Sequence, residues 1–286
     1  MSESVLYGLI GMSGFALSNF FTATLIKRGH PMIYVSLWVQ LFVLTALVLF
    51  LPLYASQEFC LDSFFKMSAV GFLVGIGILS LLKGFTEGAV AVVLPVTASW
   101  AVVLALLSFL WGGEVFTSIK AVGIVLTVLG VVLGSTDLSV LSKESSIGIQ
   151  AGVKWALVTA LSWGVAFFLW GRFAQMHWYF AVLSVKFWCV VLLFVVLTFS
   201  RMKFGGLCAK IPGVIIVVVV TDIVGTVAQN LGFTSSAPAV TGAVISAGAA
   251  LTATMSFVFL RERLKAIQWV GVFFVTCGIA TLALSG

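Results

Sequence analysis

The chain has 286 residues, of which 62% are apolar and only 8% are Asp, Glu, Lys or Arg, and its formal net charge is +6. Soluble domains contain about 25% charged and about 45–50% apolar residues, so this composition predicts an integral membrane protein. The positive charge does not indicate a nucleic-acid binder, because the basic residues form no cluster of the size that such binding needs. The four cysteines show no metal-ligand spacing, and we expect neither a metal nor a cofactor.

Apolar runs long enough to cross a bilayer follow one another along the whole chain. About 20 helical residues span the hydrocarbon layer, and a closed barrel is excluded because the runs do not alternate in polarity. The first run begins almost at Met1 without a basic segment or a cleavage site, so we expect a retained helix rather than a signal peptide. The predicted fold is all-α, with ten membrane spans at 4–26, 32–54, 67–84, 88–110, 117–134, 149–171, 178–199, 211–232, 238–260 and 266–284.

The chain repeats itself at a separation of 148 residues. Gly84-Phe85-Thr86 aligns with Gly232-Phe233-Thr234, and the match continues without a gap to give 16 identities over 50 positions. Chance would give roughly 5 in so apolar a composition, and similarity at a fixed separation indicates an internal duplication. We expect a first copy at 1–138, a linker at 139–148 and a second copy at 149–286.

Each copy holds five predicted spans, so the second copy enters the membrane upside down relative to the first. Inverted repeats are typical of secondary transporters, whose substrate site lies near the midplane between the two halves. Five spans per copy, Trp163-Gly164 in the first helix of the second copy, a Glu that closes the fourth helix and a Gly-rich fifth helix resemble the EamA branch of the drug/metabolite transporter superfamily. The first copy reads Gly14-Phe15 where the second has Ser162-Trp163. The resemblance therefore indicates the superfamily, and neither a subfamily nor a substrate.

Two features that recur in both copies have structural explanations. Glu114 and Glu262 each separate two apolar helices, where a carboxylate either caps the next helix or pairs with neighbouring arginines. Glycines at spacings of seven and four form one face of the fifth and tenth helices, and small residues let helices approach closely in lipid, so we expect these two helices to pack together. The glycines of this face are Gly123, Gly130 and Gly134, echoed by Gly271 and Gly278.

Lysine and arginine are distributed unequally between the loops. An excess of Lys and Arg marks the cytoplasmic side, and the odd-numbered loops hold nine of these residues against three in the even-numbered loops. The count predicts that both termini lie outside, whereas the resemblance implies cytoplasmic termini, and we keep the charge count. The nine are Lys27, Arg28, Lys143, Arg201, Lys203, Lys210, Arg261, Arg263 and Lys265, and the three are Lys66, Lys120 and Arg172.

Three ionisable residues stand out inside the predicted spans, where each costs about 2.5–3.5 kcal/mol on insertion scales and needs a reason. Lys186 and Asp222 lie within the seventh and eighth helices. They either neutralise each other as a structural pair or face a watery cavity, in which Lys186 holds a substrate carboxylate or phosphate and Asp222 holds an amine or a proton. Lys83, near the end of the third helix, either contacts the substrate, snorkels to the interface or pairs with Glu87 one turn on.

Uncharged residues complete the predicted site. Tryptophans deep inside spans are either packing residues or walls for an organic substrate, through stacking or cation–π contact. Amide side chains within spans either orient a substrate or bond between helices, and these residues are Asn19, Gln40, Gln229 and Asn230. Turns rich in Gly, Ser and Thr precede Pro95 and Pro238 near the starts of the fourth and ninth helices, and are either plain turns or kinks beside the cavity. The residues assigned to the site are Trp38, Trp100, Trp163, Trp188, Asn19 and Asn230.

The sequence also separates the possible classes of function. An enzyme is not expected, because Asp222 lacks a second buried Asp and no nucleophile elbow, zinc motif or Walker A loop occurs. A channel is disfavoured, because channels are usually oligomers around a pore. The resemblance implies a transporter of a small polar metabolite, an amino acid or related compound, exported across the cell inner membrane, with protons as a candidate coupling ion and a monomer or homodimer as the assembly. The alternative is a flippase for a lipid-linked sugar or polyprenyl phosphate.

Overall fold

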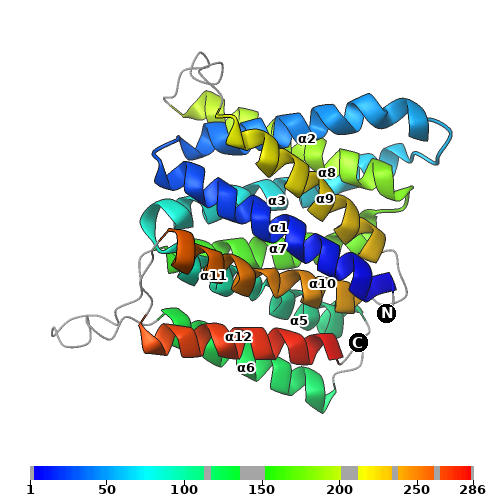
Figure 1. Cartoon of the computed structure of the whole chain (residues 1–286). Helices are drawn as coiled ribbons and strands as arrows, with labels where there is room; N and C mark the ends of the chain where they lie inside the picture. The colour runs from blue at the N-terminus through cyan, green and yellow to red at the C-terminus, as the bar shows by residue number, and fades with distance from the viewer. Residues whose placement is uncertain are drawn as a thin grey trace.

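A computed structural model describes residues 3–112, 117–135, 152–200, 212–233, 238–260 and 265–284. All regular secondary structure in these ranges is helical (Figure 1). Glu114 and Glu262, with the caps or ion pairs predicted for them, lie outside the described residues. The helices are α1 (Glu3–Lys27), α2 (Met32–Tyr54), α3 (Leu61–Glu87), α4 (Val90–Ala98), α5 (Trp100–Gly112), α6 (Ser118–Ser135), α7 (Val153–Phe173), α8 (Trp178–Phe199), α9 (Val214–Phe233), α10 (Pro238–Ser246), α11 (Gly248–Phe259) and α12 (Ala266–Leu284).

Seven described segments are long and apolar enough to cross a membrane, and one of them runs through α4 and α5. Three shorter apolar helices, Ala121–Val131, Val244–Phe259 and Ala266–Thr281, fall on the predicted fifth, ninth and tenth spans. The chain is thus an all-helical multi-pass membrane protein, and the number of ten crossings stays a prediction. α1 begins and α12 ends at the same end of the bundle (Figure 1), which an even number of crossings requires.

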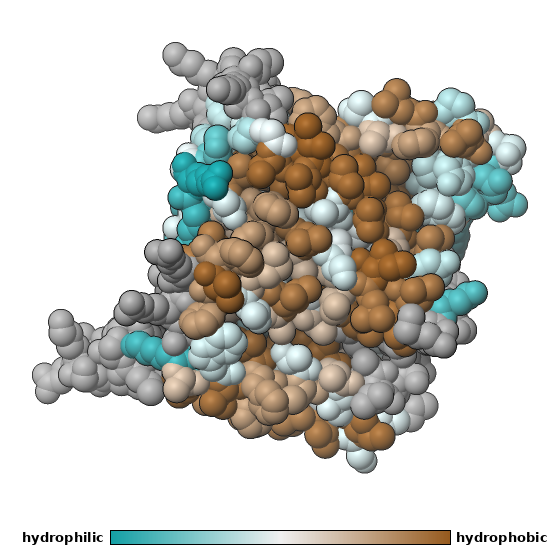
Figure 2. All heavy atoms as spheres, viewed as in Figure 1, coloured by the Kyte–Doolittle hydropathy of each residue, from teal (hydrophilic) through white to brown (hydrophobic). Residues whose placement is uncertain are grey.

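The outer surface of the bundle is suited to lipid. Figure 2 shows apolar residues over much of one face, and among the large exposed side chains Phe199 is 87% exposed, with Leu49 and Leu53 also well exposed. A soluble monomer rarely exposes so many contiguous apolar side chains, whereas a bilayer covers them. The main buried core lies further in, where α2, α3, α4, α8 and α9 pack around side chains such as Leu37 and Phe85.

The third helix is longer than predicted. The expected span was 67–84, whereas α3 runs from Leu61 to Glu87. Its charged ends remain helical because they pair along the helix: Lys66 Nζ lies 2.6 Å from Asp62 Oδ2, and Lys83 Nζ lies 3.2 Å from Glu87 Oε1. Ion pairs at this spacing support a helix beyond its apolar part, so hydropathy alone placed both boundaries too far inward.

The predicted fourth and ninth spans are each interrupted near the middle. Ser99 separates α4 from α5, and Ala247 separates α10 from α11, so the two breaks are 148 residues apart and occupy equivalent positions in the two copies. Pro95 lies inside α4 and removes a helical hydrogen bond because it has no amide N–H. Pro238 is the first residue of α10, so the break at Ala247 is not a proline kink.

The predicted pairing of the fifth and tenth helices is confirmed as the packing of α6 against α12. The contact is reciprocal. A Cβ added to Gly130 would lie 2.4 Å from the backbone nitrogen of Val275, and a Cβ added to Gly278 would lie 2.6 Å from that of Thr127. Residues 127 and 130 correspond to 275 and 278 by the offset of 148, and such exchanged contacts are the mark of a two-fold axis.

The same symmetry relates two further helix pairs, because α1 packs on α9 and α7 packs on α3. A Cβ on Gly225 would lie 2.9 Å from the ring of Phe15, and a Cβ on Gly77 would lie 2.2 Å from the indole nitrogen of Trp163. The two aromatic residues are 148 positions apart in the sequence, and so are the two glycines. Phe15 therefore fills, in the first copy, the place that Trp163 fills in the second, which explains the departure of the first copy noted in the sequence.

Candidate functional site

A cavity of about 170 Å³ lies in the interior, where the two copies meet. Its walls come from α1 to α5 of the first copy and from α7 to α11 of the second, so both copies contribute. Within the described part of the chain, α6 and α12 contribute no lining residue, since they pack on each other at the edge of the bundle (Figure 1). The cavity therefore sits where an inverted-repeat transporter places its substrate.

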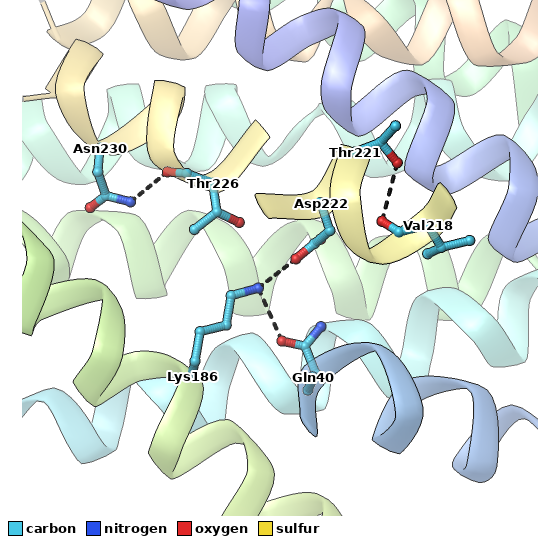
Figure 3. A network of polar contacts seen from close by, with 7 residues as sticks. All are labelled: Gln40, Lys186, Val218, Thr221, Asp222, Thr226 and Asn230. Carbon is cyan, nitrogen blue, oxygen red and sulfur yellow. Dashed lines mark hydrogen bonds and ion pairs between the residues drawn. The ribbon is translucent and has the colours of Figure 1, made fainter. Parts of the chain in front are cut away.

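Lys186 and Asp222 meet at one wall of the cavity (Figure 3). Lys186 Nζ on α8 donates to Asp222 Oδ2 on α9 at 2.8 Å and to Gln40 Oε1 on α2 at 3.0 Å. The side chains of Lys186 and Asp222 are 8% and 13% exposed. Three elements thus converge on one ammonium group, and the two charges are neutralised where hydrocarbon would otherwise make either of them costly.

Two polar residues near Asp222 on α9 form side-chain hydrogen bonds within their own helix. The Thr221 hydroxyl donates to the carbonyl oxygens of Val217 and Val218, and the Asn230 side chain donates to the Thr226 carbonyl at 2.8 Å (Figure 3). Such local bonds let a helix carry polar residues in an apolar setting. Asp222 differs from them, because its carboxylate reaches across to another helix.

Aromatic side chains form a second part of the lining. Trp100 of α5 and Trp163, Phe167 and Trp170 of α7 line the cavity. The rings of Trp100 and Phe167 meet edge to face at 4.7 Å, and the Trp163 indole donates to the Val74 carbonyl at 3.3 Å. The cavity therefore combines a charged polar wall with flat aromatic surfaces, which suit an organic molecule with one polar and one apolar part.

Five of the predicted site residues lie on the cavity, namely Lys186, Asp222, Asn19, Trp100 and Trp163. The four others lie elsewhere: Lys83, Trp38, Trp188 and Asn230 are not part of the lining.

Trp38 and Trp188 are held by neighbouring aromatic residues. Trp38 packs beside Tyr34 within α2, with the ring centroids 6.2 Å apart. The Trp188 indole donates to the Phe64 carbonyl at 2.9 Å, and its ring lies 5.5 Å from that of Phe64. The contacts of both tryptophans fit the packing role that the sequence left open.

Lys83 belongs to a charged cluster at the end of the bundle where α3 finishes. Its predicted pairing with Glu87 is confirmed, and Glu87 also lies 3.6 Å from Lys154 Nζ and accepts from the Trp155 indole at 2.7 Å. Lys27 donates to the Gly88 carbonyl at 2.8 Å in the same region. These contacts tie the first copy to the start of α7, so Lys83 serves the junction between the copies.

Several cavity residues were missed by the sequence reasoning. They are short hydroxyl side chains and aromatic residues that are common in membrane helices, and nothing in an apolar helix shows which of its sides faces a cavity. Gln40 and Gln229 had been named as possible hydrogen-bonding groups, and both lie on the lining. The missed residues are Phe15, Ser18, Thr22, Ser36, Thr97, Phe167, Trp170, Thr226 and Ser246.

Comparison with known families decides the broad identity. The EamA-like transporter family matches residues 3–136 and again residues 150–284. The chain belongs to the EamA-like transporter family. The match in two parts agrees with the internal duplication, and membership makes the chain a membrane transporter of the drug/metabolite type.

Solved structures agree on the fold of this EamA-like transporter. One crystal structure of a protein superimposes with a TM-score of 0.68 at 14% identity, over 99% of this chain and 98% of the other. At that identity the likeness shows the fold alone. No curated protein sequence matches the chain significantly. Among the described residues, no group of three or more His, Cys, Asp or Glu side chains is placed to hold a metal ion.

Proposed function

We propose that this EamA-like protein is a secondary transporter that moves a small zwitterionic metabolite, an amino acid or a related compound, by alternating access. The observation that carries the proposal is the buried contact of Lys186 with Asp222 on the cavity wall. An ammonium and a carboxylate side by side are complementary to the carboxylate and ammonium of a zwitterion. In the proposed cycle the substrate carboxylate binds Lys186 and the substrate ammonium binds Asp222, in place of the contact between the two side chains. Neither buried charge is then left without a counter-charge.

The charge of the cavity favours a net-neutral substrate over the alternative of a polyprenyl phosphate. Among the described lining residues, Lys186 and Asp222 are the charged ones, and their charges cancel. A phosphate would bring uncompensated negative charge into a low-dielectric interior and lie against the Asp222 carboxylate, which is unfavourable. The aromatic walls give room to the apolar part of an amino acid side chain.

The reciprocal packing of the two copies supports alternating access. The α6–α12 pair and the two pairs α1–α9 and α7–α3 are related by the same offset, so a rearrangement of one copy has an equivalent in the other. In inverted-repeat transporters this equivalence lets one cavity open in turn to either side. Export across the cell inner membrane, with protons as the coupling ion, is the direction and drive that we propose from the family.

Ligand-dependent thermal stabilisation of the purified protein tests this function. We expect neutral L-amino acids to raise the melting temperature, and nucleotides, sugar phosphates and polyprenyl phosphates to leave it unchanged. Lys186→Ala should abolish the shift, because it removes the partner of the substrate carboxylate. Lys83→Ala is the matched control, since it removes an equal charge outside the cavity, and it should keep the shift. Stabilisation by polyprenyl phosphates alone would favour a flippase instead.

A further inference from the structure

One face of α9 carries a row of polar side chains along the cavity. Asp222, Thr226 and Gln229 all belong to the cavity lining, and the first two are seen on α9 in Figure 3. Asp222 and Gln229 are seven residues apart. Because a helix has 3.6 residues per turn, residues at this spacing point in directions within about 20° of each other and lie about 10 Å apart along the axis. Gln229 therefore stands on the same wall as the ion pair, about two turns further along α9.

The Gln229 side chain is 7% exposed, and among the described residues no hydrogen bond engages its amide group. In the same part of the chain, the buried side-chain atoms that lack both a partner and any accessible surface are the hydroxyls of Thr97 and Ser256. The Gln229 amide is not one of them, so it keeps accessible surface, and the cavity is the space that Gln229 lines. A buried amide without a partner costs stability, and a ligand in the cavity can supply that partner.

The other amide side chains named in the sequence are engaged or placed differently. Gln40 accepts a hydrogen bond from Lys186. Asn230, the neighbour of Gln229, donates to the backbone of its own helix and is not part of the cavity lining. Asn19 lines the cavity from α1 and is less buried than Gln229. Gln229 is therefore the cavity amide that shares a helix with one member of the ion pair.

The separation between Gln229 and Asp222 suits a substrate with an extended side chain. Helical side chains lean toward the N-terminus of their helix, so Gln229 leans toward Asp222. A Gln side chain extends about 5 Å, which is about one helical turn, so about one further turn separates its amide from Asp222. A substrate whose ammonium binds Asp222 can bridge that turn with a side chain about as long as that of glutamine.

We propose that Gln229 is a specificity-determining residue of the cavity, whose amide hydrogen-bonds the end of a long, neutral, polar side chain of the substrate. The proposal deepens the function proposed above and rests on it. The substrate class is then an amino acid with a side-chain amide or a similar group at the length of glutamine. A site with a buried polar group discriminates against ligands that leave that group unpaired, so Gln229 disfavours long apolar side chains.

Two pairs of amino acids test the proposal by calorimetric titration of the purified protein. L-glutamine and L-methionine are long and differ mainly in the hydrogen-bonding group, and L-threonine and L-valine are a short pair that differs in the same way. The wild type should prefer L-glutamine over L-methionine. In Gln229→Met, which keeps the length and removes the amide, affinity for L-glutamine should fall about 5–10-fold, as expected for one neutral hydrogen bond. Affinities for the other three should change less than about 2-fold, because the short side chains do not reach residue 229.

Asn230→Leu is the matched control variant. It removes an amide from the next residue of the same helix, and Asn230 is buried but does not line the cavity. Its hydrogen bond to the Thr226 carbonyl is lost, so the melting temperature should fall. The folded variant should nevertheless keep the preference for L-glutamine over L-methionine, because the cavity wall is unchanged.

The outcomes distinguish this proposal from the proposed function. If Gln229→Met binds all four amino acids as the wild type does, Gln229 does not determine specificity, while amino-acid transport stands. An equal loss of affinity for L-glutamine and L-methionine would also overturn the proposal, because it would show a packing defect. If the wild type binds none of the four, the zwitterion transporter itself is wrong, and the role of Gln229 falls with it.

Discussion

At the scale of the residue, the site depends on two charges that are buried only because they face each other. Lys186 and Asp222 lie 2.8 Å apart, and Gln40 gives the ammonium a second acceptor. A buried ion pair contributes little net stability, but removing one partner leaves an uncompensated charge. Replacing both charged residues by apolar ones therefore distinguishes two roles of the pair. The protein should stay stable in either case, but it should lose substrate binding only if the pair binds the substrate.

Variants of the pair should show this separation in chemical denaturation and in binding. Lys186→Ala should lower the free energy of unfolding by about 3–5 kcal/mol, whereas Lys186→Met combined with Asp222→Leu should restore it close to the wild-type value. The combined variant should fold and yet bind no amino acid. Wild-type affinity in the combined variant would mean that the pair is structural only.

The residue scale is also where sequence reasoning reached its limit. Lys186 and Asp222 stood out because ionisable groups are rare in apolar helices. Trp100 and Trp38 were equivalent in the sequence, yet Trp100 lines the cavity and Trp38 does not. A helix that is apolar all round carries no amphipathic signal for its orientation.

At the scale of the element, glycines set how closely helices pack. The spacing of Gly123, Gly130, Gly271 and Gly278 was sufficient to predict the α6–α12 pair, because small residues at helical spacing form a contact face in lipid. The breaks at Ser99 and Ala247 were less predictable. Pro95 lies inside α4, four residues before the first break, whereas α10 has no proline beyond its first residue. A proline disturbs the helical turn before it, so proline is not the shared cause of the two breaks.

Alanine substitutions should separate a packing glycine from a free one. A Cβ at Gly130 would lie 2.4 Å from the backbone of Val275, whereas a Cβ at Gly171 would meet nothing within 4 Å. Gly130→Ala should lower the free energy of unfolding by about 1–3 kcal/mol, as overpacking does. Gly171→Ala should leave it unchanged or raise it by up to about 1 kcal/mol, since Ala favours a helix. Equal melting temperatures for the two variants would argue against the tight α6–α12 contact.

At the scale of the whole molecule, two copies of one five-helix unit build the bundle and share one cavity. The duplication was visible in the sequence as 16 identities at a fixed offset. The structure extends it to α1, α3, α7 and α9, where Phe15 and Trp163 fill equivalent places against Gly225 and Gly77. The charged pair breaks the symmetry, because Lys186 and Asp222 correspond to Trp38 and Val74 in the first copy.

The orientation of the bundle gives a prediction at this scale. α1 begins and α12 ends at one end of the bundle (Figure 1), and the sequence assigns nine Lys and Arg residues to the odd-numbered loops against three to the even-numbered loops. The positive-inside rule then places both termini outside the cytoplasm. A C-terminal alkaline phosphatase fusion should be active and a C-terminal green fluorescent protein fusion dark. The opposite result would show that the charge count gives the wrong orientation.

Counterflow in proteoliposomes tests the central claim most directly. Vesicles that contain the purified protein and are loaded with unlabelled L-glutamine should take up labelled L-glutamine faster than vesicles without protein. Vesicles with the Lys186→Met and Asp222→Leu combined variant, shown to be folded, should take up label no faster than empty ones. Uptake by that variant at the wild-type rate would contradict the account, because transport would then not depend on the buried charges that are proposed to bind the zwitterion.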